Sequence, residues 1–220
     1  MSEERSAPLG RLILVPAVIT LAVTLLRLVG ELSGWSPTFF SREPGGGGSL
    51  VGISWLVPVF GAWFGWTLAR AGQAPPSLGR ASALTLLAIA VVPALGFAAR
   101  AVGLEEMSPT TFGFYVAGSI AGLVVGLRAW PALGRTLLAY AFAARIPVAI
   151  VMLAAIFGDW GTHYDVPPDP MFPAMAPLAK WFAIGLLPQM TIWIWYTVVL
   201  GGLFGIAAAA ITRRRRTATP

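Results

Sequence analysis

The stretch RLILVPAVITLAVTLLRLVGE, residues 11–31, decides the fold class. Its only charged residues are two arginines and one glutamate. Its length matches the roughly 20 residues that a helix needs to cross a bilayer. Apolar residues follow one another continuously in this stretch instead of alternating with polar ones, which favours a helix over a strand of a β-barrel. The sequence predicts an all-α bundle of six transmembrane helices over residues 11–212, with tails at 1–10 and 213–220. Five further segments share this character: about 50–70, 81–103, 110–128, 136–158 and 189–211.

The composition indicates that lipid is the main solvent. The chain of 220 residues is 57% hydrophobic and only 11% charged, whereas a soluble domain carries about 25% charged residues. It contains no cysteine, which excludes disulfides, thiolate catalysis and cysteine-ligated metals. The net charge of +6 lies in the flanks of the apolar segments. We therefore expect no nucleic-acid partner and no cofactor.

The basic residues predict an orientation, because Arg and Lys concentrate in the cytoplasmic flanks of membrane helices. Most of the arginines fall on one side: Arg5, Arg11, Arg70, Arg80, Arg128, Arg135 and residues 213–216. The other side holds Arg27, Arg42, Arg100, Lys180 and most of the acidic residues. Both termini are thus predicted to be cytoplasmic, in a plasma membrane and specifically a bacterial inner membrane. The first segment is too long for a signal-peptide core and is expected to remain as a helix.

The last apolar stretch, residues 177–212, is longer than one crossing requires. Pro188 interrupts it, and a proline inside a helix removes a hydrogen-bond donor. We predict a short interfacial helix at 177–187 on the outer face, with Lys180 and Trp181 at the headgroup level. The alternative is one long, kinked and tilted helix.

Glycines recur at four-residue spacing in three of the segments. This spacing places them on one helix face and lets two backbones approach closely. We favour packing within the chain, and a homo- or hetero-oligomer through these glycine faces is the alternative. The glycines are Gly61 and Gly65, Gly118, Gly122 and Gly126, and Gly201 and Gly205.

Charged residues inside the membrane are the main indication of function, because they are costly there and usually face the interior. Arg145 lies about ten residues past Arg135, or roughly 15 Å along a helix. An ion pair that orders the bundle is the alternative to a ligand role for Arg145. Arg27 can pair with Glu31 four residues later or extend to the headgroups.

A ligand-binding cluster is accordingly predicted near the outer face. For Arg100, as for Arg27, the alternative is that the side chain extends to the lipid headgroups. Gln189 lies beside Pro188, where it could line a cavity, whereas the aromatic residues at 193–196 are interpreted as interface anchors. The predicted ligand-binding residues are Arg145, Arg27, Arg100, Glu31 and Gln189.

The segment DWGTHYDVPPDP, residues 159–170, holds the only histidine. Its side chains are candidate metal ligands at His163, Asp165 and Asp169, since nitrogen and carboxylate donors suit zinc, manganese or iron. No spaced motif such as H-E-x-x-H is present, so no metal is predicted. Candidate catalytic residues are His163, Asp165 and Glu31. A structural loop, stiffened by its prolines, is the favoured interpretation.

These features lead to three hypotheses for the function, given in order of preference. The first is a transporter or membrane-embedded substrate-binding subunit, with an arginine-containing pocket that opens to the outer face and takes an anionic or amphipathic small ligand. The second is a non-catalytic subunit of a larger membrane complex. An enzyme with an outer-face site ranks third. The segment PGGGGS, residues 44–49, lacks the lysine of a P-loop and is read as a flexible connection or as bare backbone against a ligand.

Overall fold

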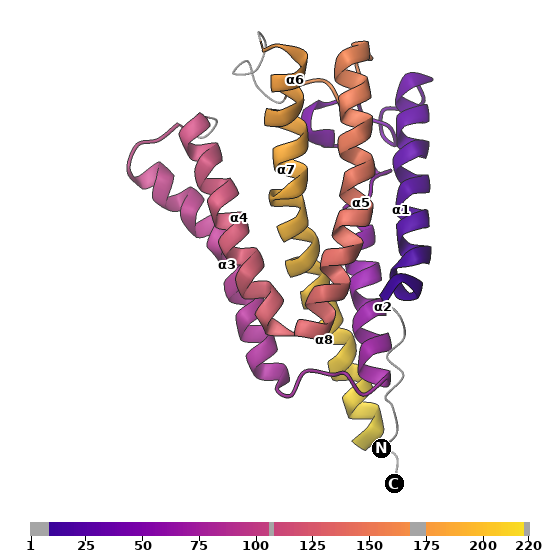
Figure 1. Ribbon diagram of the computed structural model, residues 1–220, viewed down its shortest axis with the longest axis vertical. Coiled ribbons are helices and arrows are strands. Elements are labelled where there is room, and N and C mark those ends of the chain that lie inside the picture. The colour runs from indigo at the N-terminus through magenta and orange to yellow at the C-terminus, as the bar shows by residue number, and fades with distance from the viewer. Residues whose placement is uncertain (1–8, 106–107, 168–174, 218–220) are drawn as a thin grey trace.

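The computed structural model describes residues 9–105, 108–167 and 175–217, with side chains up to residue 213. Every regular element in these ranges is helical, which confirms the all-α prediction (Figure 1). The elements are α1 (Leu9–Leu32), η1 (Pro44–Gly46), α2 (Leu56–Arg70), α3 (Leu78–Ala101), α4 (Pro109–Ala129), α5 (Pro131–Gly158), α6 (Pro177–Lys180), η2 (Trp181–Leu186), α7 (Leu187–Met190) and α8 (Ile192–Thr217).

Five helical runs are long and apolar enough to cross a membrane. They are α1, α3, α4, α5 and the run Pro177–Arg213. Their outer surfaces carry exposed aliphatic and aromatic side chains, for example Leu14, Leu86 and Ile150. Without water at such a surface, exposed apolar groups carry no hydration penalty. These features indicate a membrane-embedded, multi-pass protein.

The predicted count of six crossings is not confirmed, because α2 has only 15 residues. At 1.5 Å per residue it extends about 22 Å, less than the roughly 30 Å of a hydrocarbon core. The prediction began this helix at residue 50, but residues 47–55 are irregular. Gly45, Gly46 and Gly48 adopt positive φ angles, which glycine tolerates and which do not continue an α-helix.

The segment from Pro177 to Thr217 forms one nearly continuous helical run rather than an interfacial helix followed by a crossing. Pro188 does not end the helix. The six residues before α7 form a π-helical segment, and local changes of helix register of this kind accommodate prolines in membrane helices. Thr191, between α7 and α8, has backbone torsions outside the helical range (φ −121°, ψ −75°). The predicted separate outer-face helix is not confirmed, and the alternative of one long kinked helix describes this run.

Glycines join α2 to α8 at very close range. A Cβ atom placed on Gly61 or Gly65 would overlap backbone atoms of Gly201 or Gly205. The chain therefore brings two backbones into contact in the way that the four-residue spacing predicts. Around this contact the core is built from Phe60, Phe64 and Tyr140 with Leu133, Leu137 and Val198.

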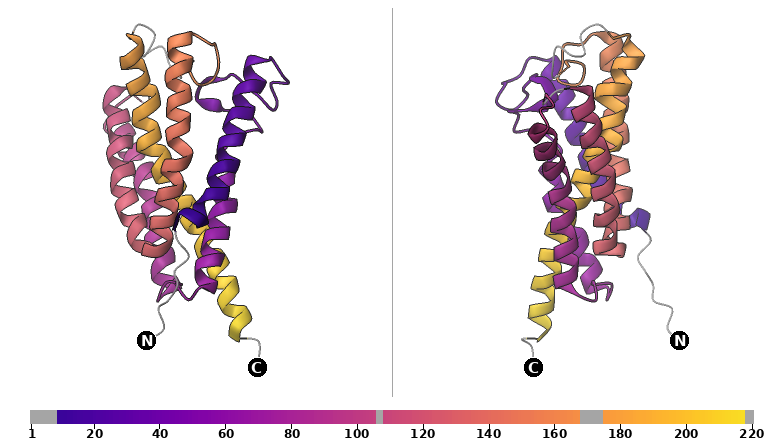
Figure 2. Two further views of the ribbon diagram at one scale, coloured as in Figure 1. Left: turned by 45° about the vertical axis from the view of Figure 1, so that its right-hand side comes forward. Right: turned by 90° about the vertical axis from the view of Figure 1, so that its left-hand side faces the viewer.

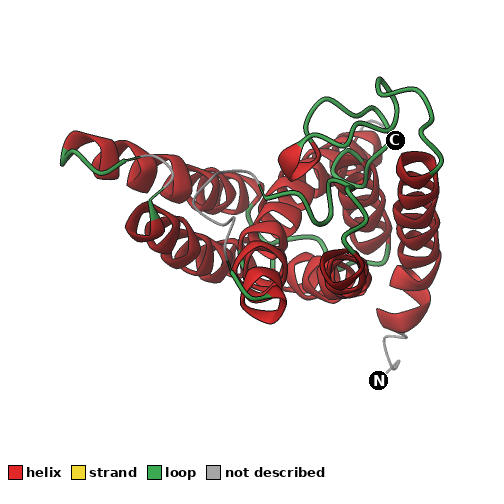
Figure 3. Cartoon of the chain, turned by 90° about the horizontal axis from the view of Figure 1, so that it is seen from above, coloured by secondary structure: helices red, strands yellow, loops and turns green. Residues whose placement is uncertain are grey.

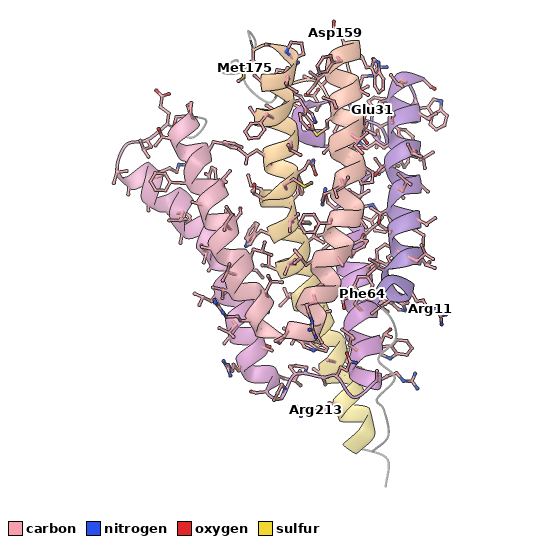
Figure 4. The ribbon with its side chains drawn as sticks, viewed as in Figure 1. Arg11, Glu31, Phe64, Asp159, Met175 and Arg213 are labelled. Atoms are coloured by element: carbon pink, nitrogen blue, oxygen red, sulfur yellow. The ribbon has the colours of Figure 1, made fainter. Side chains whose placement is uncertain are left out.

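The bundle has two distinct ends. Arg11 and Arg213 lie toward one end, whereas Asp159 and Met175 lie at the other (Figure 4). The first end also carries the connection between α2 and α3 and the tight junction at Trp130 between α4 and α5. Toward the second end, the α3–α4 hairpin diverges from α7 (Figures 1 and 3). Two views turned about the vertical axis show the loops gathered over α1 and α5 at that end (Figure 2).

The α2–α8 contact generates a stability prediction. Gly65→Ala should lower the free energy of unfolding by about 1–3 kcal/mol, because its Cβ has no room against the backbone of Gly205. Gly113→Ala in α4 is the matched control, since no atom lies within 4 Å of its Cβ position. Thermal unfolding in detergent micelles, followed by circular dichroism, measures both. Equal stability of the two variants would contradict the packing described here.

Candidate functional site

A cavity of about 320 Å³ extends from the middle of α5 to the loops at the end away from the termini. Ligand pockets in proteins range from about 300 to 1,000 Å³. Its wall is formed by α1, α4, α5 and α8, by residues 45–54 and 163–166, and by the helical run at 183–189. Of the predicted ligand-binding residues, Arg27, Arg145 and Gln189 line it.

Arg145 is buried in the middle of the bundle. It lies 14 residues after the first residue of α5 and 13 before the last, so each end of the helix is about 20 Å away. The residue is only 3% exposed, and its Nε atom has no hydrogen-bond partner. Its guanidinium carbon lies 4.6 Å from the centre of the Trp193 ring. Within the described residues no carboxylate pairs with Arg145, so the ion pair considered as its alternative role is not found.

The cation–π contact gives Arg145 only part of the stabilisation it lost on leaving water. A desolvated cation over a tryptophan gains about 2 kcal/mol, whereas burial costs several kcal/mol per ion. A bound anion would supply the remaining charge compensation. Arg145 is therefore suited to recognise a negative group inside the cavity.

Gln189 is a second buried polar group with an unused hydrogen-bonding atom. It is 7% exposed, and its Nε2 atom lies 3.8 Å from the Sδ atom of Met152. Its Oε1 atom has no partner. Buried polar atoms in native proteins are nearly always bonded. The wall of this cavity thus presents both a donor from Arg145 and an acceptor from Gln189.

Glu31 organises the upper part of the site. Its side chain is fully buried, and it lies near the end of α1 (Figure 4). Arg27 Nε donates to Oε1 at 2.8 Å, and the backbone N–H of His163 donates to Oε2 at 2.9 Å. The ring Nδ1 of His163 lies 2.5 Å from Oε1. Arg42 donates to the backbone carbonyl of Glu31. This carboxylate therefore ties α1 to the loop that follows α5.

Arg27 does not extend to the headgroups, because it is only 8% exposed and points into this network. Its Nη2 atom donates to the carbonyl oxygens of Ser41 and Gly46 at 3.2 Å each. A Cβ atom on Gly46 would lie 3.0 Å from the His163 ring. The glycine-rich segment is thus bare backbone packed against the cavity wall.

The loop after α5 is a structural cover. Asp165 accepts from the backbone N–H groups of Gly161 and Thr162 at 2.9 and 2.7 Å, and from the Thr162 hydroxyl at 2.6 Å. Tyr164 donates to the carbonyl of Thr24 on α1 at 3.2 Å. Asp159 ends α5 in a left-handed conformation. Asp165 is occupied by its own loop, which favours the structural interpretation of this segment.

His163 lines the cavity. Burial lowers the pKa of its imidazole below 6.5, and the positive charge of Arg27 lowers it further, against the opposing hydrogen bond to Glu31. The ring is therefore neutral at neutral pH. Because a carboxylate only accepts hydrogen bonds, Nδ1 carries the proton and Nε2 keeps a lone pair.

The remaining predicted residues lie elsewhere. Arg100 is exposed on α3 and is not part of the cavity wall. Asp169 lies outside the described residues. In the parts of the chain that the structure describes, no three His, Asp or Glu side chains gather as a metal site would require.

Sequence reasoning missed the aromatic members of the site. Trp193 stacks on Arg145 rather than anchoring at an interface, and Phe112 and Tyr115 bring α4 to the cavity. Trp195 Nε1 donates to the carbonyl of Ala88 on α3 at 2.9 Å. Their apolar character gave no signal that separates a cavity wall from a lipid-facing surface. The one available signal in the sequence was that a buried Arg145 requires a partner group for its charge.

No protein-family model, no curated protein and no solved structure matches this chain. The geometry of the cavity is therefore the basis for a functional proposal.

The Glu31 network predicts a large effect of one substitution. Glu31→Gln should lower the free energy of unfolding by about 3 kcal/mol or more, because Arg27 would remain buried without its counter-charge. Glu43→Gln, at an exposed glutamate, is the control and should leave stability unchanged. Chemical denaturation in micelles at neutral pH measures both. A loss that is equally small in both variants would contradict a stabilising role for this network.

The lowered pKa of His163 predicts a pH dependence. Below pH 6.5 the unfolded chain binds a proton at this histidine before the folded protein does. The free energy of unfolding should therefore fall as the pH drops from 6.5 toward the folded pKa, and this contribution should be constant below it. His163→Gln should lack this component. Unfolding curves of both proteins at a series of pH values measure it, and identical slopes would refute it.

Proposed function

We propose that the protein binds a small anionic molecule in its membrane-embedded cavity and acts as a transporter or as the substrate-binding subunit of a membrane system. One observation carries this proposal: Arg145 lines a cavity of about 320 Å³ with its Nε atom buried and unpartnered. Intramembrane charges usually mark substrate or ion pathways.

The proposed orientation follows from the charge distribution. The arginine-rich flanks lie at the end that carries Arg11 and Arg213 (Figure 4), so both termini are proposed to be cytoplasmic. The cavity then lies nearer the outer face of a plasma membrane, in a bacterium the inner membrane. We further propose that α2 is the sixth crossing, and that Lys180 and Trp181 lie at the outer headgroup level.

Irregular helices around the cavity support transport rather than permanent storage. Pro147 lies two residues after Arg145 in α5. On the facing run, the π-helical segment at 181–186 and the distorted Thr191 come just before Trp193. Discontinuous helices form the substrate sites of many transporters. The irregular segments around Arg145 resemble that arrangement.

A second candidate function is an enzyme that acts at the same cavity. The Glu31–His163 pair favours it, because a carboxylate that orients a neutral imidazole is a general-base arrangement. It ranks lower, since no hydroxyl nucleophile of a known motif is present in the sequence.

The remaining alternative is a non-catalytic subunit of a larger complex. A homo- or hetero-oligomer through the glycine faces stays a prediction. The close contacts of Gly61 and Gly65 with α8 support packing within the chain.

Anion binding is tested with the purified protein in nanodiscs of phosphatidylcholine. The probes are phosphate, acetate, benzoate and palmitate, and the readout is the shift in unfolding temperature. At least one anion should stabilise the wild type, and Arg145→Gln should lose that shift because the buried cation is gone. Arg100→Gln, an exposed arginine outside the cavity wall, should retain it.

Two outcomes would overturn the proposal. One is a panel in which no anion stabilises the wild type. The other is an anion effect of the same size in the wild type and in a folded Arg145→Gln variant. Uptake of the labelled anion into proteoliposomes then separates a transporter, which gives saturable flux, from a binding subunit, which gives none.

A further inference from the structure

Both α4 and the helical run at 183–189 contribute to the cavity wall. Phe112 and Tyr115 from α4 line it, and so do Ala183 and Ile184 from η2. All four residues are half-buried rather than closed off by packing. The α3–α4 hairpin diverges from this run toward the same end (Figures 1 and 3). From the half-buried residues of α4 and η2 in the cavity wall, we infer a lateral opening between these two elements.

The surface around this opening is apolar. Phe114 on α4 and Phe182 on η2, neighbours in sequence of the lining residues, are exposed, and so is Phe97 on α3. Such side chains are stable only against lipid or a covering partner. In a membrane-embedded protein, a lateral opening at this position admits molecules that are already dissolved in the bilayer.

One part of the wall, from η2 to Arg145, is apolar, whereas Arg27 and His163 line the part under the loops. Val148 and Met152 on α5 and Pro188 on α7 continue the surface that begins at Ile184. Arg145 and Gln189 are the polar groups at its inner end. The cavity thus has the polarity of an amphiphile, with a binding site for a polar headgroup inside and an apolar channel outward.

The charges of the cavity wall determine which headgroup charge the site would bind. The Arg27 cation is neutralised by Glu31 at 2.8 Å, and His163 is neutral at neutral pH. Asp165 is held by its own loop. Arg145 is then the uncompensated charge among the described residues of the wall, so a single negative charge balances it.

We propose that the ligand is a bilayer-dissolved monoanionic amphiphile, which enters sideways between α4 and η2 and places its headgroup on Arg145. This inference rests on the proposed function and names its substrate class. The chain of the amphiphile lies along the apolar wall and extends into the bilayer through the opening. Arg145 donates to the negatively charged headgroup, which accepts hydrogen bonds.

The test uses a chain-length series in nanodiscs of phosphatidylcholine, with the full-length protein. The probes are palmitate, acetate and the neutral alcohol hexadecanol, and binding is measured by the change in unfolding temperature and by native mass spectrometry. Palmitate should bind saturably, and acetate and hexadecanol should not. Arg145→Gln should weaken palmitate binding by about tenfold or more, the loss of one charged hydrogen bond. Arg145→Lys should retain part of the affinity.

The route is tested with a matched pair of substitutions. Ala183→Trp narrows the opening and should slow or abolish palmitate binding. Ala179→Trp adds the same bulk one helical turn earlier, at an exposed residue outside the cavity wall, and should bind as the wild type does. Equal binding by both variants would overturn lateral entry.

The remaining outcomes separate the two proposals. Acetate that binds as tightly as palmitate, with the same dependence on Arg145, would overturn the amphiphile inference and leave the proposed function standing. Hexadecanol that binds as tightly as palmitate would overturn the role of Arg145 in recognition. If neither palmitate nor acetate binds, the proposed function itself is overturned.

Discussion

The buried carboxylate of Glu31 is the interaction on which the upper half of the molecule depends. In lipid, an isolated carboxylate is too costly to persist. Glu31 is stable because Arg27, His163 and the backbone of His163 all bond to it. Each of these contacts also fixes a segment: the end of α1, and the loop after α5. Through the hydrogen bonds of Arg27 to Ser41 and Gly46, the same network holds the connection between α1 and α2.

The two arginines of the cavity differ in how their charge is compensated. Arg27 is fully compensated and serves the fold, since it joins three segments around Glu31. Arg145 is equally buried, yet the partner of its guanidinium is the ring of Trp193 rather than a carboxylate. A structural role would favour a paired charge, because replacing an unpaired buried cation with an apolar residue would stabilise the bundle. Under the proposed function, the ligand supplies the charge that Arg145 lacks.

The sequence was sufficient for the helical class and for the depth of Arg145, because hydropathy and helix rise are local properties. It overestimated α2, since residues 50–55 have apolar side chains but follow a glycine-rich segment whose backbone is not helical. It also predicted a break at Pro188, whereas the helical run continues through this residue after a π-helical segment at 181–186. The pairing of Glu31 with His163 joins residues 132 positions apart. Such a contact depends on tertiary packing, as does the placement of Trp193 over Arg145.

The two ends of the bundle differ in how regularly their helices are built and packed. At one end, α2 and α8 are fastened by glycine contacts that leave no space for a side chain. Toward the other end, α4 lies apart from η2, and the facing run contains a π-helical segment and a distorted residue at Thr191. A closely packed base therefore carries a less regular upper half. A ligand that binds Arg145 would contact both α5 and α8, so its charge would favour whichever arrangement of the upper helices encloses it.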